Sequence, residues 1–363
     1  MTTILQPGEH LPAGAEYLPA AAGNLMGGRL PCAADAPVLK LEPGQEAVVD
    51  TLSHEGVLED QGRDPRAFFA AHGVDGELVL RDAVALAASH ADRDAATDGP
   101  HVVTGPIHVA GARPGDLLKV TVSRLERRVP YGIVSNRHGK GALAGEFPRS
   151  PGNVSIFAGV EEHDSGAAFG TMAPNAGAGR AIRFPLRPFL GTMGVAVAGD
   201  VRPHSVPPGR HGGNIDINLL TEGAALYLPV QVDGALAYVG DPHFAQGDGE
   251  VALTAMEASL RARLRFDVVP REDALRLFGE QLGPVAQTTE FLVPTGMNED
   301  LDEAVRECVR AAIALLQARW GLDAEHAYAY LSAATDFNIS QVVDLVKGVH
   351  ARIRLEDFAG VAP

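Results

Sequence analysis

The chain has 363 residues, of which 46% are hydrophobic, enough apolar surface to bury one large core or two smaller ones. The 46 acidic residues exceed the 30 basic ones, and the net charge of −16 argues against a nucleic acid or an anionic membrane surface as a partner. Two cysteines, Cys32 and Cys308, give no disulfide framework. No signal-peptide pattern is visible, and no stretch approaches the ~20 apolar residues that span a bilayer. We therefore predict a cytoplasmic protein whose acidic charge would not repel a neutral substrate, although such a charge commonly serves solubility alone.

The distribution of turn residues indicates the fold class. The 41 glycines and 25 prolines separate many short segments in which apolar and polar residues alternate. This favours a mainly β fold of sandwich or barrel layers with α excursions, α+β overall. We predict one large catalytic domain over residues 1–363, with a helical insertion at 52–95 and a C-terminal helical segment at 299–352. Residues 1–35 are expected to form an arm or loop that packs on a neighbouring subunit.

Several local patterns predict individual elements. Residues 38–50 alternate about a Pro-Gly pair, which predicts a hairpin. Asp64 followed by a proline predicts a helix start, and 78–90 predicts a second short helix. Apolar residues at helical spacing predict a helix from 299 to 320 that ends at Gly321, and the stretches 323–332 and 339–349 are predicted as two more helices.

The residue types that perform chemistry gather between positions 207 and 250. They lie around three short apolar runs and are His211, Asn214, Asp216, Asp241, His243, Gln246, Asp248 and Glu250. From 213 to 219 Asn and Asp alternate with Ile and Leu, so a strand would bury one face and present polar groups on the other. Asp and Asn beside Gly are also ordinary turn residues. Their density nevertheless favours a metal site or an acid–base site.

Long motifs in this stretch resemble those of the acetamidase/formamidase family, whose members hydrolyse small carboxamides to a carboxylate and ammonia. The similar segments are Pro-Gly-Arg-His-Gly-Gly-Asn-x-Asp at 208–216, Leu-Tyr-Leu-Pro-Val at 226–230 and Gly-Asp-x-His-x-x-x-Gly-Asp-Gly-Glu at 240–250. Segments 104–116 and 188–196 match as well, and the resemblance extends over about residues 36–355. It implies a hydrolase acting on carbon–nitrogen bonds other than peptide bonds. The stretch 52–95 is longer than the link in simpler members, which leaves the substrate open.

Amide hydrolysis requires an activated water, a polarised carbonyl and a protonated leaving nitrogen. The sequence has no Gly-x-Ser-x-Gly elbow, and both cysteines lie outside the motif stretch, so a covalent route has no support. Our hypothesis is a divalent metal, with Zn²⁺ preferred, bound by Asp216, Asp241 and His243. Mn²⁺ or Ca²⁺ would suit the same ligand types, and a metal-free acid–base site is the alternative.

The remaining polar residues receive roles within this hypothesis. Glu250 is the general base that passes its proton to the leaving nitrogen, and Asp248 either orients a ligand imidazole or joins the metal shell. The amide oxygen would be bound by His211 and Asn214, with the backbone N–H groups of Gly212 and Gly213 near it. His138, in a loop with flanking glycines, is a candidate substrate contact.

Other readings stay open at this point. His54 and Glu55 directly follow a predicted strand and could reach a site at its end, or lie in a solvated loop. A cyclic amide (γ-lactam) hydrolase would use similar chemistry in a larger pocket shaped by 52–95. A β-sandwich binding module with a structural Ca²⁺ is the alternative outside enzymes. The N-terminal arm and the resemblance predict a homo-oligomer, a dimer or higher.

Overall fold

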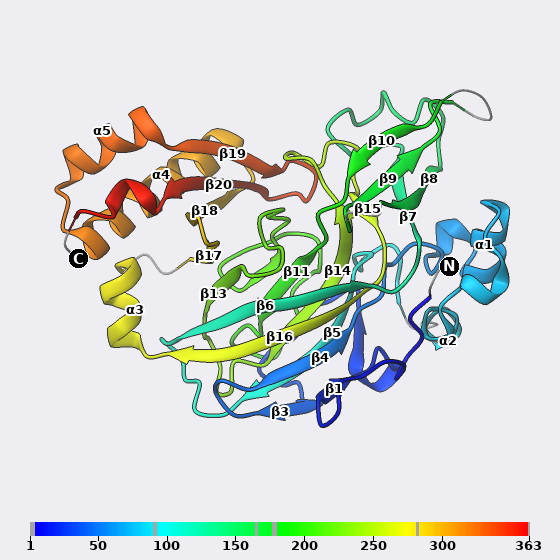
Figure 1. The fold of residues 1–363 in the computed structure, drawn as a ribbon, viewed down its shortest axis with the longest axis horizontal. Coiled ribbons are helices and arrows are strands. Elements are labelled where there is room, and N and C mark those ends of the chain that lie inside the picture. Colours follow the sequence, from blue (N-terminus) through cyan, green and yellow to red (C-terminus); the bar gives the residue numbers. More distant parts are fainter. Residues whose placement is uncertain (1–3, 90–92, 164–165, 176–179, 281–282, 362–363) are drawn as a thin grey trace.

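Two large sheets form the body of the protein in the computed structural model, which describes residues 4–89, 93–163, 166–175, 180–280 and 283–361 (Figure 1). The first sheet has nine strands, in the spatial order β1 (Glu16–Leu18), β4 (Glu46–Asp50), β16 (Leu260–Val269), β6 (Leu117–Arg127), β13 (Ala225–Pro229), β17 (Val285–Gln287), β18 (Phe291–Asn298), β20 (Lys347–Arg354) and β19 (Asp336–Gln341). Only β1 and β4 run parallel within it.

The second sheet carries most of the residues of interest. Its strands follow the order β10 (Ile182–Pro185), β9 (Ala168–Met172), β8 (Asn153–Glu162), β7 (Tyr131–Arg137), β15 (Met256–Glu257), β14 (Ala237–Ala245), β11 (Phe189–Val195) and β12 (Gly212–Asn214). Strand β5 (Val102–Val109) also pairs with β14, and β2 (Leu25–Gly27) and β3 (Leu39–Leu41) pair with β5. The predicted mainly β, α+β fold is confirmed.

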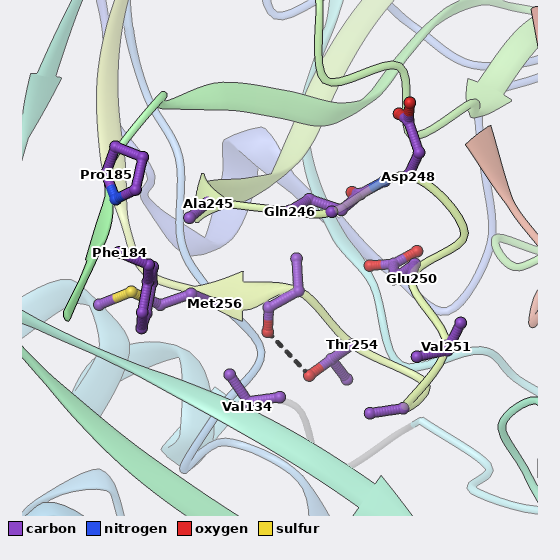
Figure 2. A pocket seen from close by; sticks show the side chains of 13 residues that line it. Val134, Phe184, Pro185, Ala245, Gln246, Asp248, Glu250, Val251, Thr254 and Met256 are labelled. Atoms are coloured by element: carbon purple, nitrogen blue, oxygen red, sulfur yellow. Dashed lines mark hydrogen bonds between the residues drawn. The ribbon is translucent and has the colours of Figure 1, made fainter. Parts of the chain in front are cut away.

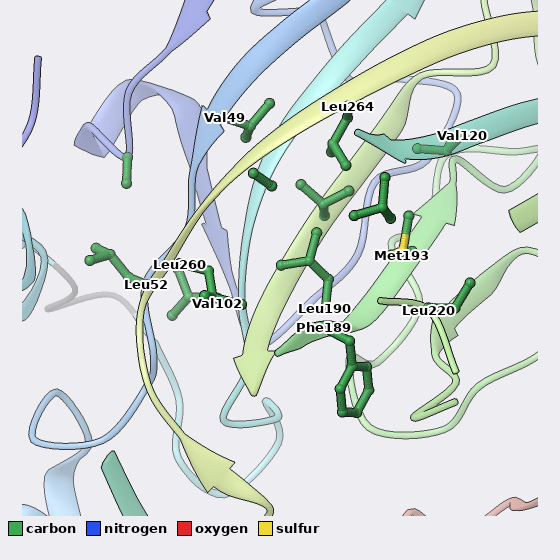
Figure 3. Close-up of a cluster of buried hydrophobic side chains, with 14 of the residues drawn as sticks. Val49, Leu52, Val102, Val120, Phe189, Leu190, Met193, Leu220, Leu260 and Leu264 are labelled. Carbon is green, nitrogen blue, oxygen red and sulfur yellow. The ribbon is translucent and has the colours of Figure 1, made fainter. Parts of the chain in front are cut away.

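The main core lies between the two sheets, as the alternation in β16 illustrates. Leu264 and Phe266 are fully buried there, whereas Arg265 between them faces solvent. The second sheet contributes Phe189, Leu190 and Met193 to the same cluster (Figure 3). Burial of a Leu or Phe side chain contributes about 1.5–3 kcal/mol, so this core supplies most of the driving force for folding.

Helices cover two separate parts of the sheets (Figure 1). Near the N-terminus are α1 (Pro65–Ala71), where the Asp64 side chain accepts hydrogen bonds from two first-turn N–H groups as predicted, and α2 (Arg81–Ser89). At the other end are α3 (Arg271–Phe278), α4 (Leu301–Trp320) and α5 (Ala324–Ala334); α4 packs on β18 and β20, and α3 and α5 pack on α4. Gly321 ends α4 with a φ of 68°, which confirms that prediction. The division of the chain into a single domain with these two excursions stays a prediction.

Three local predictions were wrong. The stretch 339–349 forms parts of β19 and β20 instead of a helix, because its β-branched residues pair as a hairpin around the turn at 342–346. The 38–50 stretch contains two strands, but β3 joins the second sheet and β4 the first, so its Pro-Gly pair turns the chain between sheets. The strand expected at 213–219 ends at Asn214, because Asp216 adopts a φ of 49°.

The N-terminal segment packs on its own chain. Strand β1 pairs with β4 and β2 pairs with β5, so the described part of 1–35 is integrated into both sheets and does not form a projecting arm. Within the described ranges, none of the helices has the length and apolar character needed to cross a membrane.

Candidate active site

A cavity of about 670 Å³ opens between the second sheet and the loops beside it. Six ionisable side chains that are at least nine-tenths buried line it: His54, His101, Asp241, Glu250, Glu257 and Asp344. Parts of its wall come from the 52–95 stretch, the loop after β7 and the turn between β19 and β20. The cavity thus joins segments that lie almost 300 residues apart in the sequence.

The second sheet sets the central geometry. Asp241 and His243 are two residues apart on β14, and the β14–β15 register places Glu257 directly opposite His243. His243 Nε2 lies 3.1 Å from Asp241 Oδ2 and 3.0 Å from Glu257 Oε1. Asp241 has a φ of 50°, a conformation that is uncommon for a residue with a side chain. Such strain is found at functional sites, where surrounding contacts hold it in place.

A glutamine determines which nitrogen of His243 carries a proton. Gln246 Nε2 donates to the backbone carbonyls of Asp216 (3.0 Å) and Ser340 (3.1 Å), which fixes the orientation of the amide. Gln246 Oε1 therefore faces His243 Nδ1 at 3.0 Å and accepts a hydrogen bond from its N–H group. His243 Nε2 is then the nitrogen available to a cation or to the two carboxylates.

His54 completes this side of the cluster. Its Nδ1 lies 3.5 Å from Asp241 Oδ1 and its Nε2 lies 3.4 Å from Glu55 Oε1, and neither nitrogen forms a well-aligned hydrogen bond with another described residue. The ring packs edge-on against His101, with the centroids 5.8 Å apart. Glu55 is held from behind by the hydroxyl of Ser135 at 2.7 Å. The sequence left two alternatives for His54 and Glu55. The structure agrees with the one that places them at a site, and not with the solvated loop.

Burial and neighbouring charges shift the pKa values in opposite directions. Burial would lower the pKa of His54, but Asp241 and Glu55 outweigh it and raise that pKa to about 10. The pKa of His243 is likewise raised, because Glu257 and Asp241 overcome the effect of burial. Burial raises the pKa of Glu257 to about 7, whereas imidazoles, above all His243, overcome burial and hold the pKa of Asp241 well below its usual range.

A second group of carboxylates lies next to this cluster: Asp216, Glu250 and Asp344. Burial, followed by the charges of the neighbouring acids, raises the pKa of both Asp216 and Glu250 well above the ordinary values. Burial raises the pKa of Asp344 to about 8. Asp216 Oδ1 is 3.9 Å from His243 Nδ1, so the two groups adjoin.

The site contains atoms and space that suit a metal ion. Two sets of described residues have potential ligand atoms within 4.8 Å of one another: His54, Asp241 and Glu257, and Asp216, His243 and Glu250. Buried atoms without hydrogen-bond partners among the described residues include both nitrogens of His54, Asp241 Oδ1 and Glu257 Oε2. Gly191 leaves a small space at the centre. A Cβ there would lie 2.5 Å from Asp216 Oδ1, 2.6 Å from His243 Cε1 and 2.8 Å from Asp241 Oδ2.

The structure brings some of the sequence-predicted residues together. Asp216, Asp241, His243 and Glu250 meet in these two adjoining groups, and Asn214 also lines the cavity. Asn214 Oδ1 accepts a hydrogen bond from Thr192 Oγ1 at 2.7 Å, which sets the direction of its amide.

Other predicted residues lie elsewhere. Asp248 faces away from the cluster and bonds Asn218, Asn338 and Arg352, so it fastens β19 and β20 to the loop after β14. His211 does not line the cavity, and burial lowers its pKa to about 4.

The remaining predicted contacts are also absent from the cavity wall. Gly212 and Gly213 belong to β12, beside β11, and neither lines the cavity. His138 Nδ1 lies 2.8 Å from the carbonyl of Pro148, and the cavity wall is formed by its neighbours Arg137 and Gly139 instead.

The sequence reasoning missed Glu257 and Asp344. Glu257 follows a loop after the motif stretch, and only strand pairing shows that it faces His243. Asp344 fell in a predicted helix, and its role depends on a turn between two distant strands.

A second cavity of about 420 Å³ lies against the loop after β14 (Figure 2). It is mainly apolar and is lined by Phe184, Pro185 and Met256 among others. Glu250 and Thr254 line both cavities, so the segment that carries Glu250 separates them. The position of Glu250 on this thin wall depends on a φ of 46°.

The sequence matches the Acetamidase/Formamidase family over residues 84–205 and 198–355. The chain belongs to the acetamidase/formamidase family. It is 29% identical over 300 residues to an acetamidase of Mycolicibacterium smegmatis, covering 64% of this chain and 73% of that protein. It is 29% identical over 311 residues to a formamidase of Methylophilus methylotrophus, covering 70% and 75%. A crystal structure of an acetamidase from Bacillus halodurans superposes with a TM-score of 0.73 at 25% identity, covering 96% of this chain and 100% of the other.

Family membership confirms the predicted class of reaction. The chain is a hydrolase that acts on carbon–nitrogen bonds other than peptide bonds, in small amides. The binding-module alternative is thereby set aside.

Proposed function

We propose that the chain hydrolyses a small linear carboxamide, of the formamide or acetamide type, to a carboxylate and ammonia, and that it uses a divalent metal ion to do so. The observation that carries this proposal is the buried group of imidazoles and carboxylates with unpartnered atoms at the base of the cavity. The proposed ligands are His54, Asp241, Glu257 and the Nε2 atom of His243. Asp241 and His243 stay as predicted from sequence, whereas Glu257 and His54 replace Asp216.

Mixed imidazole and carboxylate ligands suit Zn²⁺, which is our proposed metal. The contact between Gln246 and His243 Nδ1 supports this choice, because ligand histidines usually donate their other N–H to an acceptor. When bound, such an ion supplies Lewis acidity, which polarises a carbonyl and lowers the pKa of water to about 7.

The protein's own residues carry the proton transfers in this proposal. Glu250 lines the cavity and is 8% exposed, so it can reach both water and substrate while staying largely desolvated. It takes a proton from the attacking water and gives it to the leaving nitrogen, which departs as ammonia. Asn214, at the cavity wall, offers a polar contact to the amide.

A cyclic amide is the second candidate substrate, and the size of the cavity favours it. Cavities of roughly 300–1,000 Å³ accommodate drug-sized ligands, whereas formamide has three non-hydrogen atoms. The volume of about 670 Å³ therefore leaves room for a γ-lactam ring. Leu58, Glu59 and Asp60, from the 52–95 stretch, form part of the wall, in keeping with the predicted influence of that stretch on the substrate.

The test is ammonia release from formamide and acetamide, and ring opening of a γ-lactam, by wild-type protein and the Glu257→Gln variant. We expect the wild type to release ammonia from a linear amide and the variant to lose both activity and bound metal. Glu290→Gln, an exposed glutamate remote from the cavity, is the matched control and should behave as wild type. Full activity of Glu257→Gln would contradict the ligand assignment, and turnover of the lactam alone would select the second candidate.

The oligomeric state stays a prediction. Val154 and Ile156 on β8, and Ile182 on the edge strand β10, expose apolar side chains near this end of the second sheet. We propose a homo-oligomer, and light scattering coupled to size exclusion tests it: a monomer at micromolar concentration would contradict it.

A further inference from the structure

Cationic side chains gather on the wall of the cavity of about 670 Å³, away from the buried carboxylates at its base. They are Arg93, Arg137, Lys140 and Lys347. The whole chain has four lysines, and two of them line this one cavity. In a protein with a net charge of −16, such a concentration of cations in one place requires a local explanation.

The two arginines are neutralised by acids of the same wall. Arg93 pairs with Glu59, and Arg137 Nε lies 2.6 Å from Asp60 Oδ2. Asp98, the third acid of this wall, is bonded at 2.8 Å by an arginine that does not line the cavity. Arginines and acids therefore balance one another on the described part of the wall, and the two lysines are the cations in excess.

The two lysines differ in what their ammonium groups contact. Lys347 Nζ donates to the backbone carbonyls of Glu299 at 2.6 Å and Leu345 at 3.3 Å. Lys140 Nζ forms no hydrogen bond or ion pair with any residue that the structure describes. An exposed lysine ordinarily extends into solvent, whereas this one lines the cavity. Its charge is therefore available to a molecule bound inside.

The turn that carries Lys140 is fastened to the segment that carries Glu250. The backbone N–H of Lys140 donates to the carbonyl of Arg137 at 3.0 Å, which closes the turn. The N–H of Ala142 then donates at 2.9 Å to the carbonyl of Val251, the residue after Glu250. The backbone that bears this cation is thereby fixed relative to the proposed general base.

His204 adds a neutral donor to the same wall. Its Nδ1 accepts the N–H of Val206 at 3.1 Å, so its own hydrogen is on Nε2. Burial, followed by the charges of Arg29 and Lys140, lowers the pKa of His204, so the ring is neutral at pH 7 and lies close enough to Lys140 to sense its charge. An ammonium and a neighbouring N–H together offer two donors to the two oxygens of a carboxylate.

We propose that Lys140 and His204 bind a carboxylate at the far end of the amide substrate, so that the substrate class is the monoamide of a short dicarboxylic acid. This inference rests on the proposed function, because it concerns the substrate of the same site. The reacting amide fills only a small part of the cavity, and the rest of the substrate meets this wall. Hydrolysis of the C–N bond by water then yields a dicarboxylate and ammonia.

The test compares succinamate with butyramide, in which a methyl group replaces the distal carboxylate. Malonamate and glutaramate, which have one methylene fewer or more, are measured against propionamide and valeramide in the same way, and the best of the three pairs is used. We expect the wild type to favour the charged amide by about 10–100-fold in kcat/KM, mainly through a lower KM. Raised salt should narrow this preference, because it screens an exposed charge.

Variants assign the preference to Lys140. Lys140→Ala should lose most of it, while kcat/KM for the neutral amide stays within about twofold of the wild type. Lys140→Arg should retain most of it, because the charge is kept. Lys40→Ala is the matched control, since Lys40 is exposed and does not line the cavity, and it should behave as wild type.

The outcomes separate this inference from the proposed function. Equal turnover of the charged and neutral amides by the wild type would overturn the inference and leave amide hydrolysis standing. An equal fall for both amides in Lys140→Ala would also overturn it, since that result indicates a structural role. If no amide is hydrolysed, the proposed function fails, and isothermal titration calorimetry with succinamate tests the wall directly. Binding by the wild type and Lys40→Ala, with loss in Lys140→Ala, would support the site, and no binding by the wild type would overturn it.

Discussion

Two buried groups of charged residues in this protein differ in how their charges are balanced. The first joins the N-terminal segment to β4 and β16 and contains two arginines and two aspartates. Arg261 bonds Asp50 through two nitrogens, at 2.6 and 2.9 Å, and Arg128 lies 2.7 Å from Asp82. Tyr17 adds a hydrogen bond to Asp50 at 2.6 Å. Each negative charge therefore faces a guanidinium.

The second group, at the base of the cavity, has six carboxylates: Glu55, Asp216, Asp241, Glu250, Glu257 and Asp344. No ion pair among the residues that the structure describes joins its Asp241, His243 or Glu257 to a guanidinium. Several of its atoms have no partner among the described residues. The comparison teaches that burial of charge alone does not identify a functional site. The structural group pairs each aspartate with a guanidinium, whereas the cavity group leaves its carboxylates for a ligand to neutralise.

The largest effect should come from Glu250 in the cavity group. Glu250→Gln should lower kcat for a linear amide by about 10²–10⁴-fold, because the variant has no base for proton transfer. Its stability toward urea in metal-free form should equal or exceed that of the wild type, because burial raises the pKa of the Glu250 carboxyl and the neutral amide avoids the cost of ionising it. Steady-state kinetics with urea unfolding on the same preparation measure both, and near-normal kcat would remove Glu250 from its role.

The balanced group should show the opposite behaviour. Arg261→Leu should lower the free energy of unfolding by about 3–5 kcal/mol, because Asp50 would remain buried without its main partner. The folded fraction should keep the wild-type kcat. Arg265→Leu is the control on the same strand: this exposed arginine pairs with Asp267, so it should cost about 0–1 kcal/mol. Equal effects of the two variants would refute the structural role.

A smaller effect is expected from filling the space at Gly191. Gly191→Ala should weaken metal binding and lower stability by about 1–3 kcal/mol, because the new methyl group meets three side chains of the cluster. Gly247→Ala is the matched control, since no atom lies within 4 Å of the added methyl. Metal retention during dialysis compares the two, and unchanged retention in Gly191→Ala would place the cation elsewhere.

The mildest perturbation is pH. Burial raises the pKa of Glu257 to about 7, so a proton competes with the metal for this carboxylate below that pH. Metal affinity should fall by up to about tenfold for each pH unit below 7 for this one proton. The stability of the metal-free protein changes with pH in the opposite direction to the metal affinity. The reason is that a raised carboxyl pKa means that the folded state holds its proton more tightly than the unfolded chain. This contribution to stability is present at low pH and is lost as the pH rises from about 4.5 to 7. Competition with a chromophoric chelator between pH 6 and 8 checks the affinity, and a flat profile would exclude Glu257.

Part of the site followed from sequence because it depends on local geometry. Asp241 and His243 share the parity of one strand, and β14 places both in the cluster. Asp216 was expected on the polar face of a strand. Asp216 reaches the site because its own backbone adopts the left-handed conformation, which an alternation of polar and apolar residues does not predict.

The remainder depends on long-range pairing. Glu257 meets His243 only through the register of β15 against β14, and Asp344 arrives on a turn that was predicted as helix. The fold class followed from turn spacing. The assignment of β3 and β4 to different sheets did not, because a Pro-Gly turn has the same local sequence in a hairpin and at a corner between sheets.

The most direct test of the central claim combines metal content with ammonia release on one preparation. Both would be measured as purified, after chelation, and after metal is restored. The account predicts that ammonia release from a linear amide disappears with the metal and returns with it, with the protein folded throughout as judged by circular dichroism. Full activity of the folded, metal-free protein would contradict it, and would make the buried carboxylates and imidazoles a direct acid–base site.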